Sequence, residues 1–171
     1  MTADISFKSL HWTEIGDSEN KKHPISTLPC PEEHIHGQLD IIVAGKPLPS
    51  LGYLGPDDVC MTTWVQELTT ILNTLDGRLE TVYVFDEREQ GQPAYEFRRE
   101  FDLLFLSVID SKIYGQHGDP SYQSISCTWF DFVASVRACL AELRMEIENE
   151  AGEIGQAWWL ANAYQIGRAH V

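Results

Sequence analysis

The stretch YEFRREFDLLFLSVID, residues 95–110, limits most strongly what this chain can fold into. Its first half alternates aromatic with charged residues, and its second half is apolar apart from Ser107 until the final aspartate. One straight strand of this length would span about 50 Å, whereas a compact domain of this chain length is about 40 Å across. We therefore expect a bend, bulge or tight turn near 100–102, with successive sheet elements at 79–86, 94–100 and 103–110.

The change in composition along this stretch also predicts how it is buried. Residues 94–100 suit a strand with one solvated face, while 103–110 suit a strand covered on both faces, with helices lying over it. Tyr95, Phe97 and Phe101 share one side of the first strand. We expect them to be exposed aromatics, and the strand to be an edge that a partner strand could join.

Two segments have the periodicity of amphipathic helices. Residues 57–77 carry an apolar stripe, begin with Asp57 and Asp58, and end at Gly77; the stripe comprises Trp64, Leu68, Ile71 and Leu75. Residues 128–152 carry a second stripe between a capping Thr128 and Gly152, and it comprises Trp129, Val133, Val136, Leu140, Leu143 and Ile147. Residues 157–166 predict a last short helix whose tryptophans cover the core. The fold class is therefore α+β, a mostly antiparallel sheet covered by two main helices plus a short C-terminal helix.

The N-terminal part is less regular, and we interpret residues 1–171 as a single domain. Residues 5–12 alternate as a short strand, and 38–43 predict a strand that enters a hairpin through the turn at 44–46. Between them, residues 13–37 are rich in proline and turn-forming residues, which predicts a long loop or arm.

Charge and cysteine usage narrow the setting in which the protein works. The chain has 26 acidic and 12 basic residues, a net charge of −14, which disfavours binding to nucleic acid or an anionic membrane and speeds encounter with a basic partner. Such an excess also serves solubility alone. The four dispersed cysteines indicate reduced thiols, and no signal or membrane-spanning segment is apparent, so we expect a cytoplasmic protein.

Catalytic fingerprints are missing from the sequence, and we expect no cofactor. The best candidate for chemistry is the segment CPEEHIHG, in which an extended backbone would place Glu32, His34 and His36 on one side. Such residues can share a metal ion, with Cys30, His23 or His11 as a further ligand. The spacing matches no established zinc signature, and the alternative interpretation is a solvated loop.

Carboxylates gather at two places that could meet a cationic partner. One group, in the predicted hairpin turn, comprises Asp86, Glu87 and Glu89. The other lies at the end of the long predicted helix, where negative charge opposes the helix dipole, and comprises Glu146, Glu148, Glu150 and Glu153. An exposed acidic turn can also be harmless in a stable domain. Whether the two groups adjoin depends on the tertiary fold.

The layout from about residue 38 to 150 resembles small acidic bacterial proteins of the immunity type, found beside polymorphic or contact-dependent toxins. The segments that carry this resemblance are DIIVAGKPL, VYVFDEREQGQPAYEFRREFDLLFLSVID and FDFVASVRACLAELRMEI. These families have no sharp motif, so the resemblance transfers no functional residue. It implies a stoichiometric inhibitor that occludes a basic surface of a toxin.

Three functions follow from these observations. The leading hypothesis is a non-catalytic acidic binding protein, an immunity protein that neutralises a cognate toxin by occluding a basic protein surface. The first alternative is a metal-dependent hydrolase built on Glu32, His34 and His36. The second is a structural subunit that forms a homodimer through the hairpin edge or the 129–147 stripe.

Overall fold

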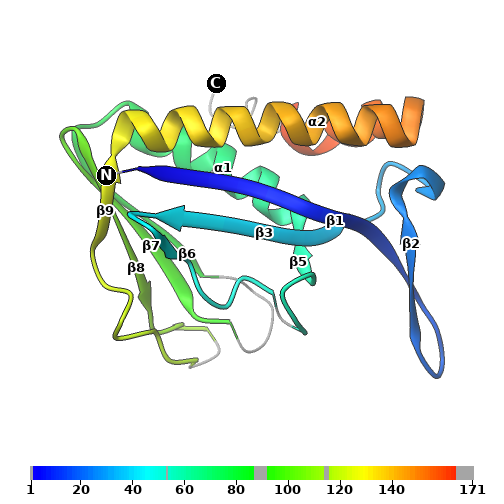
Figure 1. Cartoon of the computed structure of the whole chain (residues 1–171), viewed down its shortest axis with the longest axis horizontal. Coiled ribbons are helices and arrows are strands. Elements are labelled where there is room, and N and C mark those ends of the chain that lie inside the picture. Colours follow the sequence, from blue (N-terminus) through cyan, green and yellow to red (C-terminus); the bar gives the residue numbers. More distant parts are fainter. Residues whose placement is uncertain (1, 53, 87–91, 114–115, 165–171) are drawn as a thin grey trace.

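Two antiparallel sheets and two main helices make up an α+β fold (Figure 1). The computed structural model describes residues 2–52, 54–86, 92–113 and 116–164. The first sheet has the order β2-β1-β3-β4, with β5 also paired to β3; its strands are β1 (Ala3–Ile15), β2 (Asn20–Pro24), β3 (His36–Val43), β4 (Lys46–Pro47) and β5 (Val59–Cys60). The second is a meander of β6 (Glu80–Asp86), β7 (Ala94–Glu100), β8 (Leu103–Ile109) and β9 (Ile125–Thr128).

The first sheet is built on the long pairing of β1 with β3. β3 alternates half-buried with buried residues along its whole length, as a strand with one core face does. The predicted turn after it is confirmed, since Ala44 and Gly45 both have positive φ, 52° and 76°, the conformation that tight two-residue hairpins use. β1 is longer than predicted, and its pairing register shifts between Lys8 and His11, where Ser9 has a φ of 59°.

The prediction of a loop or arm at 13–37 is wrong in part. β1 continues to Ile15 and β2 pairs with it, so the polar segment is an edge hairpin rather than a loop. A short 3₁₀ turn, η1 (Ile25–Thr27), then places Ile25 and Leu28 in the core. The polar composition did not predict a strand because backbone pairing needs no apolar side chains. Pro24 is compatible with this strand because it lies at the end of an edge strand, where its missing N–H leaves no hydrogen bond unmade.

The bend predicted inside 95–110 is confirmed. β7 ends at Glu100, β8 begins at Leu103, and Phe101 in the turn between them has a φ of 55°. Each strand pairs with the next in antiparallel register, from Glu100 opposite Leu103 to Ala94 opposite Ile109. The chain therefore reverses direction at Phe101, because one straight strand over 95–110 would be longer than the domain.

The burial predicted for these two strands is wrong in part. The charged face of β7 is partly solvated and Phe101 is 56% exposed, as predicted, but the strand is not an edge and its other two aromatic side chains are buried. Tyr95 and Phe97 are 1% and 0% exposed, because β7 is a central strand between β6 and β8 and that face lies against the helices. The opposite face of this sheet is mostly half-buried and is not covered by helices. There the Arg98 guanidinium lies 4.8 Å from the Phe105 ring centre, and the neighbouring Val82 is 48% exposed.

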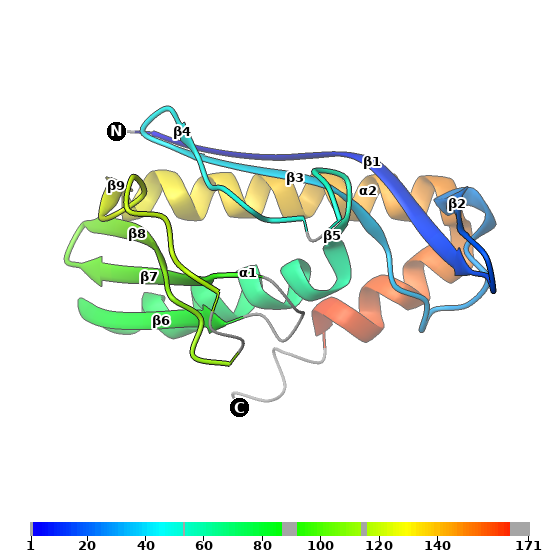
Figure 2. The same ribbon diagram turned by 90° about the horizontal axis from the view of Figure 1, so that it is seen from below.

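Helix α1 (Met61–Asp76) buries all four residues of its predicted stripe. It begins later than predicted, after Cys60, because Asp57 and Asp58 are engaged elsewhere, with Lys22 and His36. Figure 1 shows α1 and α2 on the same side of the sheets, and Figure 2 shows α1 alongside β6 and β7.

Helix α2 (Trp129–Trp159) runs along β1 (Figure 1). Its cap is the predicted one, since the Asp131 backbone N–H donates to the Thr128 hydroxyl at 3.1 Å. Gly152 does not end the helix; it interrupts it with φ 60° and ψ −131°, after which the chain turns back and continues to η2 (Leu160–Tyr164). Trp158 and Trp159 are then buried, as predicted for the C-terminal segment.

Candidate functional site

The acidic surface predicted on the long helix lies on one side of α2. Glu142, Glu146 and Glu150 are all exposed and recur every four residues, so they form one stripe beside the buried stripe that contains Leu143 and Ile147. Glu153, just past the break at 152, is exposed too. We call Glu142, Glu146, Glu150 and Glu153 the acidic stripe.

One member of the acidic stripe, Glu142, lies close enough to a buried thiol to affect its pKa. Burial, followed by the charges of Glu142 and Asp4, raises the pKa of the Cys139 thiol to about 12. Asp4 lies on β1, which packs against α2, and the Ile5 backbone N–H donates to Ser135 of α2 at 2.8 Å. Negative charge therefore extends from α2 toward the first strand.

The remaining predicted acidic residues are placed differently. Glu148 is half-buried and paired with Arg144, with 2.9 Å between Oε1 and Nε. Asp86 accepts hydrogen bonds from the Ser111 hydroxyl at 2.6 Å and the Lys112 backbone N–H at 2.8 Å, so it holds the loop after β8. Glu87 and Glu89 lie outside the described residues.

The two acidic groups do not form one surface within the described residues. Figure 1 shows the orange part of α2, just before its break at Gly152, beside η1 and away from the end of β6 where Asp86 lies. The predicted acidic group did not include Glu142, although its spacing of four residues from Glu146 places both on one side of a helix.

The predicted histidines lie in a cleft of about 240 Å³ that is lined mainly by strands of the first sheet. β1 and β2 form one wall, while the start of β3 and the end of β5 form the other. Its lining residues are Thr13, Ile15, Asn20, Glu33, His34, His36, Asp58 and Cys60. His34 and His36 thus share a cleft as predicted, and Cys60 and Asp58 join them from a distant part of the chain.

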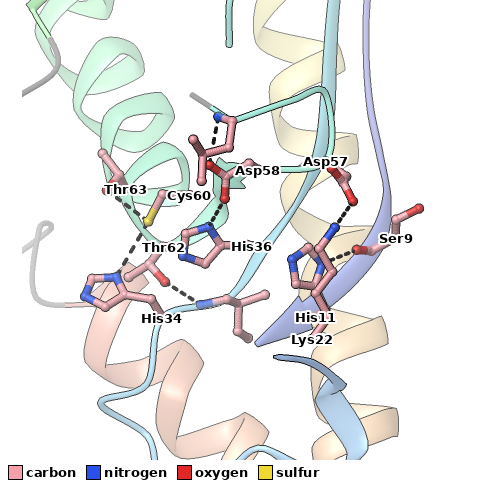
Figure 3. A network of polar contacts seen from close by, with 12 residues as sticks. Ser9, His11, Lys22, His34, His36, Asp57, Asp58, Cys60, Thr62 and Thr63 are labelled. Atoms are coloured by element: carbon pink, nitrogen blue, oxygen red, sulfur yellow. Dashed lines mark hydrogen bonds and ion pairs between the residues drawn. The ribbon is translucent and has the colours of Figure 1, made fainter. Parts of the chain in front are cut away.

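The His34 ring contacts the Cys60 thiol, as Figure 3 shows, with Nδ1 3.6 Å from Sγ. The Thr63 hydroxyl donates to the same sulfur at 3.3 Å. Two backbone contacts of Ile35 fix this geometry: its N–H donates to the Thr62 hydroxyl at 3.1 Å, and its carbonyl accepts from the Met61 N–H at 2.8 Å. The segment that carries His34 is thereby held against the first turn of α1.

His36 belongs to a second set of contacts nearby (Figure 3). Its Nδ1 lies 3.4 Å from Asp58 Oδ1, and Asp58 is itself held by the Leu54 backbone N–H at 3.0 Å. The His11 ring faces His36 with ring centres 6.1 Å apart, while His11 Nδ1 contacts the Ser9 carbonyl at 2.9 Å.

The metal ligands considered from sequence are not all gathered here. Glu32 and Cys30 are not among the residues that line the cleft. His23 stacks on Trp12 and contacts Glu14 at 2.8 Å instead. Among the described residues, no group of three or more His, Cys, Asp or Glu side chains could hold a metal ion.

No protein-family model, curated protein or solved structure matches this chain. In the described part of the chain, no helix is both long and apolar enough to cross a membrane. A functional proposal therefore has to start from the chemistry of the acidic stripe and of the cleft.

Proposed function

We propose that this protein is a non-catalytic binding protein whose acidic stripe holds a basic surface of a protein partner. The single observation that supports this proposal is the alignment of Glu142, Glu146 and Glu150 on one exposed side of α2. Among the described residues, none of the ion pairs involves a member of the acidic stripe.

This arrangement has a cost that a cationic partner would remove. Side chains four residues apart on a helix lie about 6 Å from one another, and like charges at that spacing repel. Glu150 also stands near the negative end of the first helical segment, where the dipole disfavours it. A partner that carries Lys or Arg side chains would relieve both effects, and the net charge of −14 would speed its approach.

The resemblance to immunity-type proteins suggests which class of protein the partner belongs to. We infer that it is a toxin domain with a basic functional surface, which the acidic stripe covers in a stoichiometric complex. The four free cysteines suit a reducing compartment, so we place this function in the cytoplasm.

The test is a binding measurement with the product of the adjacent reading frame, at several salt concentrations. The variant E142Q/E146Q/E150Q removes three charges from the acidic stripe. The matched control D17N/E19Q/D102N removes three exposed charges elsewhere, so both variants have the same net charge. We expect the stripe variant to lose at least ~10-fold in affinity at low salt and to show a weaker salt dependence, whereas the control keeps most of its affinity.

Two results would contradict the proposal. One is equal loss of affinity in both variants, which would assign the effect to net charge instead of the stripe. The other is the absence of any complex with that partner.

The homodimer alternative has an observation of its own. β6 is an edge strand of the second sheet, and its Val82 and Val84 are 48% and 44% exposed, so a second copy could pair there. Sedimentation velocity over a wide concentration range separates the two functions. If the protein is a monomer at all concentrations, the homodimer function is excluded and the complex with a basic partner remains the proposed function.

A further inference from the structure

Cys60 is the described cysteine that combines a neighbouring imidazole with a cleft. It is the residue immediately before α1, where the helix dipole favours negative charge. His34 Nδ1 lies 3.6 Å from its sulfur, and the Thr63 hydroxyl donates to it at 3.3 Å. A thiol with an imidazole base and a hydroxyl donor as neighbours, at the start of a helix, has the parts of an activated nucleophile.

We propose that Cys60 is a reactive thiol, with His34 as its proton acceptor, that undergoes exchange with small non-anionic disulfides in this cleft. This activity is independent of the proposed binding function, because the cleft and the acidic stripe share no residue.

The exchange step balances without any further reagent. The Cys60 Sγ–H gives its proton to His34 Nδ1, and the thiolate attacks one sulfur of the disulfide. A new S–S bond to Cys60 forms as the old one breaks, and the departing thiolate takes the proton from the His34 imidazolium. The products are a mixed disulfide on Cys60 and one free small thiol, with the disulfide as the oxidant.

The cleft limits which disulfides can react. Cys60 is 5% exposed and the cleft is about 240 Å³, so only a small molecule reaches the sulfur. Two acidic residues, Glu33 and Asp58, line the same cleft. Negative potential from these groups disfavours an anionic reagent and favours a neutral or cationic one.

The other cysteines provide internal comparisons. Burial raises the pKa of Cys127 to about 11 and that of Cys139 to about 12, which leaves both as thiols near neutral pH. Cys30 is half-buried and therefore serves as an ordinary accessible thiol.

The experiment treats the reduced full chain with three disulfides of similar size: bis(2-hydroxyethyl) disulfide, which is neutral, cystamine, which is cationic, and 3,3′-dithiodipropionate, which is anionic. Peptide mapping by mass spectrometry gives a rate for each cysteine. The variants are H34Q, T63V and C60S, each checked for folding by circular dichroism and thermal unfolding.

We expect Cys60 to react first with the neutral and cationic reagents, and the anionic one to be slowest. H34Q should slow Cys60 by at least about tenfold while leaving Cys30 within about twofold, since only Cys60 uses the imidazole as a base. T63V should slow Cys60 by a smaller factor. The proposal is overturned if Cys60 reacts no faster than Cys127 and Cys139, or if its rate ignores His34 in a folded variant.

Discussion

The Glu67 carboxylate and the Tyr83 hydroxyl meet where α1 packs on β6. The hydroxyl donates to Glu67 Oε2, and both groups are half-buried. Burial raises the pKa of Glu67 above its ordinary 4.5, and this effect outweighs the hydrogen bond, which acts in the opposite direction. Burial, together with the Glu67 carboxylate, raises the pKa of Tyr83 as well.

The sign of this shift predicts a pH dependence of stability. The pKa of Glu67 is higher in the folded state than in the unfolded state. The contribution of Glu67 to the free energy of unfolding is therefore fully present below about pH 4.5, and it is lost as the pH rises through the pKa of the folded state. Glu67→Gln removes this titration, so the stability advantage of the wild type over the variant should shrink as the pH rises above about 4.5. Urea unfolding at several pH values measures it, and a constant difference would contradict the assignment.

Asp119 provides a control of opposite sign. Hydrogen bonds from the Ser121 hydroxyl and backbone N–H lower the pKa of Asp119 below 3.8. The contribution of Asp119 to the free energy of unfolding is therefore present above about pH 3.8 and is lost as the pH falls further. Asp119→Asn should destabilise the protein near neutral pH, and urea unfolding should show this loss disappearing below about pH 3.8.

At the scale of elements, the path of α2 depends on the backbone conformation of one glycine. Gly152 has φ 60° and ψ −131°, which side chains other than hydrogen rarely tolerate. The chain turns back there, and a Cβ at Gly155 would lie 2.3 Å from the Ile147 carbonyl oxygen. This close return brings Trp158 into the core, where its Nε1 donates to the Glu33 carbonyl at 3.0 Å.

Gly152→Ala should lower the free energy of unfolding by about 1–3 kcal/mol, because alanine is strained in this conformation. Gly77→Ala is the matched control, since Gly77 has φ −80° and nothing within 4 Å of an added Cβ. Its effect should be within about 1 kcal/mol and can be stabilising. If urea unfolding gives the same loss of stability for both variants, the conformation at the break in α2 does not require glycine.

At the scale of the whole molecule, tyrosine hydroxyls join the two sheets. The Tyr95 hydroxyl of β7 lies 3.0 Å from the Pro49 carbonyl and 2.7 Å from that of Ser50. The Tyr122 hydroxyl, from the loop before β9, donates to the Lys46 carbonyl at 3.0 Å. The segment 46–50 is thereby tied to the second sheet, while its own strand belongs to the first.

Tyr95→Phe and Tyr122→Phe should each cost about 1–3 kcal/mol, because a carbonyl at the sheet junction loses its donor. We also expect amide hydrogen exchange to accelerate in a peptide that covers 46–52, where the Leu48 N–H donates to Ile41 at 2.8 Å. A peptide from α2 between 133 and 147 serves as the reference. Unchanged exchange in 46–52 would mean that side-chain packing alone joins the sheets.

The sequence by itself determined most of the elements. The reversal near residue 101, the hairpin at 44–45, the stripe of α1 and the Thr128 cap all follow from local rules of chain length, turn chemistry and periodicity. It also indicated that His34 and His36 lie together, since alternate residues of an extended segment face one side.

Only the tertiary structure decided which faces are covered and which distant residues meet. Apolar residues in β8 did not reveal that helices cover one face alone, and polar residues in 13–37 did not reveal a paired edge strand. Cys60 reaches His34 across 26 positions through the pairing of β3 with β5 and the start of α1. Periodicity describes neighbours on one element, whereas contacts between elements depend on how the whole core packs, and local sequence does not encode that.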